Sequence, residues 1–155
     1  MRVTTLLAVA SAPLAALAAP VPVPLAAVAA LIARQGTSKF CERITPAPSA
    51  EETEKRFNEF ADLFLVKKDV YKAFEYILPE YINHNPLAQN GAQNALNILG
   101  PIWGSQSITV LATKFEGPMS WLNYRSGFGT IVDRYRWEDG CIIEHWDQGE
   151  RFPAN

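Results

Sequence analysis

The stretch T-I-V-D-R-Y-R-W-E-D-G-C-I-I-E-H-W-D-Q, residues 130–148, decides the fold and carries the most informative residue of the chain. Alternation predicts a strand over Thr130 to Trp137, in which Ile131, Asp133 and Tyr135 share one face. That face is otherwise apolar, so we expect helices to cover it and to bury the carboxylate of Asp133. A buried carboxylate requires a compensating partner, and such groups often carry out proton chemistry.

A tight turn at Glu138-Asp139-Gly140 leads into a second predicted strand, Ile142 to Gln148. The length of this turn decides which residue lies opposite Asp133. A three-residue loop would place His145 there, and a two-residue loop would place Trp146 there. We favour the three-residue loop because it brings a carboxylate and an imidazole together in an aromatic hollow.

Length and composition indicate one globular domain. The chain has 155 residues, of which 48% are hydrophobic and 19% charged, and its formal net charge is −2. This charge excludes the basic footprint of a nucleic-acid-binding protein, so no nucleic-acid partner is expected.

The amino-terminal region is typical of a secreted, extracellular protein. Residues 1–18 read as a signal peptide, with Arg2 before an apolar core and a small-residue cleavage pattern at Ala16-Leu17-Ala18. Residues 19–48 form a Pro/Ala-rich arm or pro-segment, and residues 49–155 the folded domain. Prolines between Pro20 and Pro24 interrupt the apolar residues, so no stable membrane anchor is expected.

Secretion makes a disulfide between Cys41 and Cys141 the expected state of the two cysteines. Such a bond would close a loop of about 100 residues and would contribute roughly 4–5 kcal/mol in the chain-entropy model. Two unpaired buried thiols are the alternative.

Helices precede strands along the domain, which predicts an α+β fold. A first helix is expected after Ser49, a second from Asp69 to a break at Pro79, and a third over Gly91 to Trp103. Four strands follow. They are predicted over Ile108 to Phe115, Ser120 to Arg125, Thr130 to Trp137 and Ile142 to Gln148.

A polar cluster, Tyr81-Ile-Asn-His-Asn-Pro86, separates the second and third predicted helices. His84 can exchange a proton near neutral pH, and Asn85 can both donate and accept hydrogen bonds. Asn-Pro is also a common turn starter, so the cluster equally suits a purely structural turn.

This cluster, with Gly91, residues 131–140 and the segment Glu144-His-Trp-Asp147, resembles the SnoaL-like proteins of the nuclear transport factor 2-like superfamily. That superfamily includes polyketide cyclases, ketosteroid isomerases, scytalone dehydratase and limonene epoxide hydrolase. The resemblance spans roughly residues 51–148 and implies a cone: a curved antiparallel sheet closed by helices around a pocket, often dimerising through its outer face. It supports a fold more than a reaction, because this fold hosts many activities.

The resemblance implies that Asp133 occupies the position where ketosteroid isomerases hold a protonated aspartate beside an enolate oxygen. Those isomerases place an aspartate before a proline where this chain has Asn85, so the cyclases are the better comparison. We therefore expect a cofactor-independent cyclase, isomerase or dehydratase acting on a carbonyl-bearing or polyketide-like small molecule. The catalytic candidates are Asp133, His145 and His84. The substrate-binding candidates are Tyr81, Asn85, Trp103, Trp121, Tyr124, Tyr135 and Trp146.

Two other functions fit the residues. The aromatic residues equally suit a non-catalytic protein that binds a small apolar ligand, or a simple core or dimer interface. A metal site made of His84, His145 and Asp147 is the weakest reading, because no metal-ligand spacing joins the two histidines, and we expect no metal. A homodimer is expected only by resemblance, with Val132, Arg134 and Arg136 facing outward.

Overall fold

The computed structural model describes residues 39–154. The predicted signal peptide and most of the predicted arm lie outside the described residues. No helix within 39–154 is long and apolar enough to cross a membrane.

The first helix, α2 (Ala50–Ala61), begins where the sequence predicts. Ser49 and Glu52 form a capping box, in which each side chain accepts a hydrogen bond from the other residue's backbone N–H. A π-helical turn, η1 (Asp62–Val66), continues the chain and keeps Phe64 on the buried side with Phe57 and Phe60. This apolar stripe holds α2 against the sheet.

The second predicted helix is wrong in its last part. α3 (Val70–Ala73) and a short 3-10 helix, η2 (Phe74–Tyr76), end before the strand β1 (Ile77–Asn83). Pro79 lies inside this strand, where the sequence predicts a helix break. β1 is at one edge of the sheet, where a missing backbone N–H is tolerated. The polar cluster therefore starts in a strand and leaves it at Asn83.

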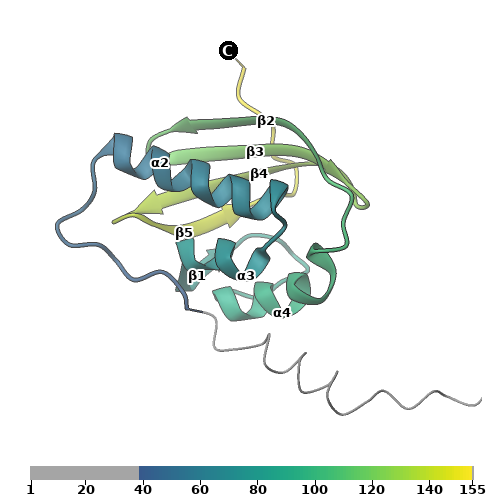
Figure 1. The fold of residues 1–155 in the computed structure, drawn as a ribbon, viewed down its shortest axis with the longest axis horizontal. Coiled ribbons are helices and arrows are strands. Elements are labelled where there is room, and N and C mark those ends of the chain that lie inside the picture. The colour runs from purple at the N-terminus through teal and green to yellow at the C-terminus, as the bar shows by residue number, and fades with distance from the viewer. Residues whose placement is uncertain (1–38, 155) are drawn as a thin grey trace, which may run out of the picture. The chain divides into compact units, whose positions relative to one another are not determined.

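The third predicted helix is confirmed as α4 (Ala92–Trp103). Gly91 precedes it with a φ of 97°, a conformation that favours glycine. α4 packs beside β1, and Figure 1 shows α3 and α4 close together there, while α2 runs across the face of the sheet.

The remaining strands are β2 (Thr109–Glu116), β3 (Met119–Ser126), β4 (Gly129–Glu138) and β5 (Cys141–Trp146). Within residues 39–154 they form with β1 a five-stranded sheet in the order β1-β5-β4-β3-β2, which confirms the α+β class. The sheet is mixed and not wholly antiparallel, because β1 pairs in parallel with β5. This difference follows from the strand that the sequence pattern did not predict.

The turn between β4 and β5 has two residues, so the predicted three-residue loop is wrong. Glu138 pairs with Cys141, while Asp139 and Gly140 have φ of 49° and 77°, as in a type I′ turn. A bulge then moves the register by one residue: Trp137 pairs with Ile142, but Arg136 pairs with Glu144. As a result Tyr135, and not Asp133, lies directly opposite His145.

The predicted buried face of β4 is confirmed. Asp133, Tyr135 and Trp137 are buried, and the residues between them are partly exposed. The ring of Phe60 on α2 meets Tyr135 edge-on at 5.1 Å between centroids and meets Trp137 in the same way at 6.3 Å. Aromatic packing therefore fixes the distance between α2 and the strand that carries Asp133.

The predicted disulfide joins Cys41 to Cys141 and closes a loop with a sequence separation of 100 residues. The backbone N–H of Cys41 also donates to Ile77 O, and Arg56 Nε donates to Gly140 O at 2.7 Å. The segment before α2 is thus bound to the start of β1, to α2 and to the β4–β5 turn.

Replacing both cysteines by serine should lower the free energy of unfolding by about 4–5 kcal/mol, because the unfolded chain loses its long covalent loop. Urea unfolding of the oxidised wild type and the double variant measures this difference. The reduced wild type is the control and should match the variant. A change below about 1 kcal/mol would show that the bond adds little to stability.

Candidate active site

A cavity of about 300 Å³ lies between the helices and the buried face of the sheet. Its helical wall includes Phe60, Phe64 and Trp103, and its sheet wall includes Tyr124 and Tyr135. Most of the lining is apolar. The polar atoms gather where β4, the end of β1 and the end of β5 come together.

Asp133 is the most buried charged residue of this cavity, with 4% of its surface exposed. Its Oδ2 accepts hydrogen bonds from Tyr124 Oη at 2.9 Å and from Tyr135 Oη at 3.2 Å. Its Oδ1 lies 3.2 Å from His145 Nε2. Both carboxylate oxygens are therefore satisfied without any arginine or lysine.

The tautomer of His145 follows from its second partner, Asn83. His145 Nδ1 lies 3.0 Å from Asn83 Oδ1, and that oxygen also accepts from the backbone N–H of Asn85 at 3.1 Å. The second bond fixes the oxygen of the Asn83 amide, so Nδ1 must carry a proton and donate it. A hydrogen bond between His145 Nε2 and Asp133 Oδ1 then requires one proton, which either atom can carry.

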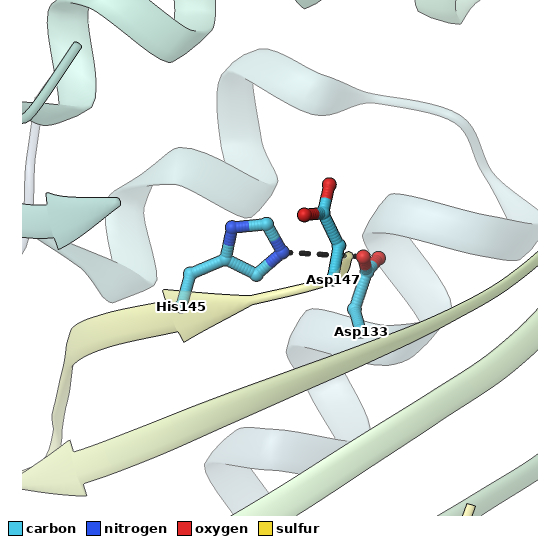
Figure 2. Close-up of side chains that lie close together, drawn as sticks. All are labelled: Asp133, His145 and Asp147. Carbon is cyan, nitrogen blue, oxygen red and sulfur yellow. Dashed lines mark hydrogen bonds and ion pairs between the residues drawn. The ribbon is translucent and has the colours of Figure 1, made fainter. Parts of the chain in front are cut away.

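Asp147, just after β5, completes the polar group. Its Oδ2 accepts a short hydrogen bond from Asn85 Nδ2. Its Oδ1 is buried and has no hydrogen-bond partner in the described part of the chain. Figure 2 shows Asp133, His145 and Asp147 extending from the same side of β4 and β5, with the His145–Asp133 contact drawn as a dashed line.

Most of the site residues predicted from the sequence line this cavity. They come from five elements and the loop after β1. They are Asp133, His145, Tyr81, Asn85, Trp103, Tyr124 and Tyr135.

His84, Trp121 and Trp146 do not line the cavity. The rings of His84 and Trp146 stack at 4.8 Å between centroids, and His84 Nε2 lies 2.8 Å from Glu144 Oε1. On β5 the inward position belongs to His145, so alternation directs its neighbours Glu144 and Trp146 to the other face. Trp121 pairs with Arg134, which also belongs to the outward set of β4. A catalytic role for His84 therefore has no geometric support.

Two polar residues of the cavity were not among the predicted catalytic or binding residues: Asn83 and Asp147. Asn83 pairs with His145 between parallel strands, and the sequence pattern does not predict that pairing. Asp147 was considered only as a metal ligand. Side chains two residues apart in an extended segment lie on the same face, and this pattern could have identified Asp147 from the inward position of His145.

The only described cluster with metal-ligand geometry is Asp133, His145 and Asp147, whose ligand atoms lie within 4.8 Å of one another. The predicted alternative set included His84, which is not part of this cluster. Asp133 Oδ1 and His145 Nε2 are bonded to each other, so a metal ion would have to separate them. These three residues are nevertheless the ones that could hold one.

The tyrosines around Asp133 are held in their neutral form. Burial, followed by the negative charge of Asp133, raises the pKa of Tyr124, of Tyr135 and of Tyr81 well above the ordinary value of 10. Burial and a hydrogen bond to Glu59 raise the pKa of Tyr76 to about 12. All four hydroxyl groups thus remain protonated donors throughout the neutral range.

These shifts predict a loss of stability at alkaline pH. A tyrosine whose pKa is higher in the folded than in the unfolded protein stabilises the fold fully at pH values below 10, the pKa in the unfolded chain. This contribution to the free energy of unfolding is lost as the pH rises towards the pKa in the folded protein. We expect the phenolate absorbance of Tyr81, Tyr124 and Tyr135 to appear together with loss of circular dichroism. Ionisation of all tyrosines near pH 10 in a folded protein would contradict this expectation.

No family model matches the sequence, and no curated protein matches it significantly. Solved structures do match, with low sequence identity. An NTF-2 like protein of unknown function from Burkholderia xenovorans is 14% identical, with a TM-score of 0.54 over 68% of this chain and 88% of the other. An NTF2-like protein of unknown function from Mesorhizobium loti is 20% identical, with a TM-score of 0.51 over 70% and 96%.

A third match is AclR from Streptomyces galilaeus, a suggested hydroxylase. It is 14% identical, with a TM-score of 0.50 over 64% of this chain and 89% of AclR. At these identities the likeness shows a shared fold and carries no information about activity.

Proposed function

Because residues 39–154 have the nuclear transport factor 2-like fold, we propose that the chain is a cofactor-independent acid/base enzyme acting on a small carbonyl compound. The reaction class is isomerisation, cyclisation or dehydration, and the substrate is apolar and polyketide-like. Asp133 and His145 act together as the proton carrier.

The single proton shared by Asp133 and His145 carries this proposal. The pair lies in the wall of a cavity with a mostly apolar lining, where hydrogen bonds to a developing charge are stronger than in water. Asn83 keeps the Nδ1 proton of His145 in place, so that only the proton at Nε2 is free to move. Tyr124 and Tyr135 hold the carboxylate of Asp133 in a fixed orientation.

The chemistry balances with this one proton. The pair gives its proton to the carbonyl oxygen of the substrate, and the α-carbon gives its proton back to the pair. The C–H electrons form a C=C bond, while the π electrons of the carbonyl move to oxygen and give an enol. Returning the proton at another carbon isomerises the substrate, and attack of the enol on a second carbonyl closes a ring.

Asp133→Asn should lower α-proton exchange by at least about 100-fold, because the amide cannot carry the proton while it still accepts from the two tyrosines. The measurement is deuterium incorporation into 2-tetralone and related neutral ketones, followed by NMR in D₂O. Asp139→Asn is the matched control, because Asp139 lies in the β4–β5 turn and not in the cavity.

Equal exchange rates in the wild type and in Asp133→Asn would refute the assignment, provided that thermal melting shows both proteins to be folded. Binding of ketones by the wild type without any exchange would favour the second candidate function, a carrier.

A non-catalytic ligand carrier is the second candidate, favoured by the apolar lining of the cavity. Leu87, Ile98 and Phe128 line it and yet are exposed by 87%, 47% and 61%. Exposed apolar side chains beside a cavity suit a ligand that extends to the surface.

Secretion and a homodimer also belong to the proposal. The disulfide supports an oxidising compartment. The partly exposed outer residues of β4, with Val110 and Leu111 on β2 exposed by 42% and 44%, offer a surface for a second copy.

A further inference from the structure

Asp147 has no role in the proton transfer proposed above, and its environment is unusual. One of its oxygens is bonded to Asn85, and the other is buried without a partner among residues 39–154. A buried carboxylate oxygen that lacks a donor costs free energy unless something else fills the place. Asp147 is itself one of the residues that line the cavity.

The charges around the cavity do not balance within the described residues. Its lining contains Asp133 and Asp147 but neither lysine nor arginine. Asp133 shares a proton with His145 and accepts from two tyrosines, whereas Asp147 receives only the neutral amide of Asn85. One negative charge therefore remains without a cation, and an anionic ligand would add to the repulsion.

We propose that the ligand of this cavity carries an organic ammonium group, which pairs with the carboxylate of Asp147 while the apolar body lies against the aromatic wall. This inference rests on the cavity being the ligand site of the proposed function. It narrows the substrate class to apolar amines, such as an amine with a nearby carbonyl. Asp147 is then the residue that determines specificity.

An ammonium group suits the position better than a hydroxyl group or a metal ion. It supplies both the missing donor and the missing charge, and the rings of Tyr81, Trp103 and Tyr135 in the same lining attract organic cations through their faces. A hydroxyl group supplies only the donor. A metal ion would have to break the bond between Asp133 and His145.

Three probes of similar size test this proposal: 1-naphthylmethylamine, 1-naphthalenemethanol and 1-naphthoate. Their affinities are measured by calorimetry at pH 7 with EDTA present, so that no metal ion competes for the carboxylates. We expect the amine to bind at least about tenfold more tightly than the alcohol, and naphthoate to bind most weakly.

In Asp147→Asn the advantage of the amine over the alcohol should disappear while the affinity for the alcohol stays the same. Asp139→Asn, with the same change of charge outside the cavity, should keep the advantage. Melting temperatures establish that the variants are folded.

Three results would overturn the proposal: equal affinities for amine and alcohol in the wild type, an amine advantage that persists in Asp147→Asn, or no binding of any of the probes. The proposed reaction is tested separately, by exchange in Asp133→Asn. If the protein prefers the amine but catalyses no proton exchange, the proposed ligand class holds and the protein is a carrier of that ligand.

Discussion

The burial of the Asp133 carboxylate is the constraint on which the arrangement of this domain depends. A carboxylate with 4% exposure needs donors from several directions, and here they come from β3, from β4 itself and from β5. His145 can serve only if its other nitrogen has an acceptor, and β1 supplies it through Asn83. Four of the five strands are thus tied to one side chain, and the cavity is the space that this network leaves on its helical side.

The bulge in β5 is the local device that makes this network possible. Without it, the two-residue turn would place Trp146 opposite Asp133 and would direct His145 to the outer face. The extra residue, Ile143, returns His145 to the inner face, where it meets Tyr135 across the strands and Asp133 along the diagonal. Aromatic packing supports this register, because the ring of His145 stacks on Tyr135 at 4.9 Å between centroids and Phe60 of α2 meets Tyr135 edge-on.

The contact between Asp133 and His145 was predicted from a turn length that the structure does not have. The sequence was sufficient for the α+β class, the inward face of β4 and the disulfide. These features follow from alternation, helical spacing and cysteine chemistry, which act over short distances or within one strand pair. The parallel pairing of β1 with β5 was not predictable in the same way, because its partners are about 60 residues apart and Pro79 interrupts the pattern. The positions of His84 and Asp147 relative to the cavity depend on that pairing. Tyr81 and Asn85 of the polar motif line the cavity, whereas His84 itself does not.

The two histidines of the chain lie in contrasting surroundings at neighbouring strands. The side chain of His145 is 12% exposed inside the cavity, and that of His84 is 42% exposed and stacked on Trp146. Because the sequence contains no other imidazole, the ring C–H protons of the two histidines would give two sets of NMR signals, one set from each residue. One reports directly on what enters the cavity. The signals of His84 respond to the solution conditions alone, because His84 lies outside the cavity. They therefore serve as an internal reference in a ligand titration.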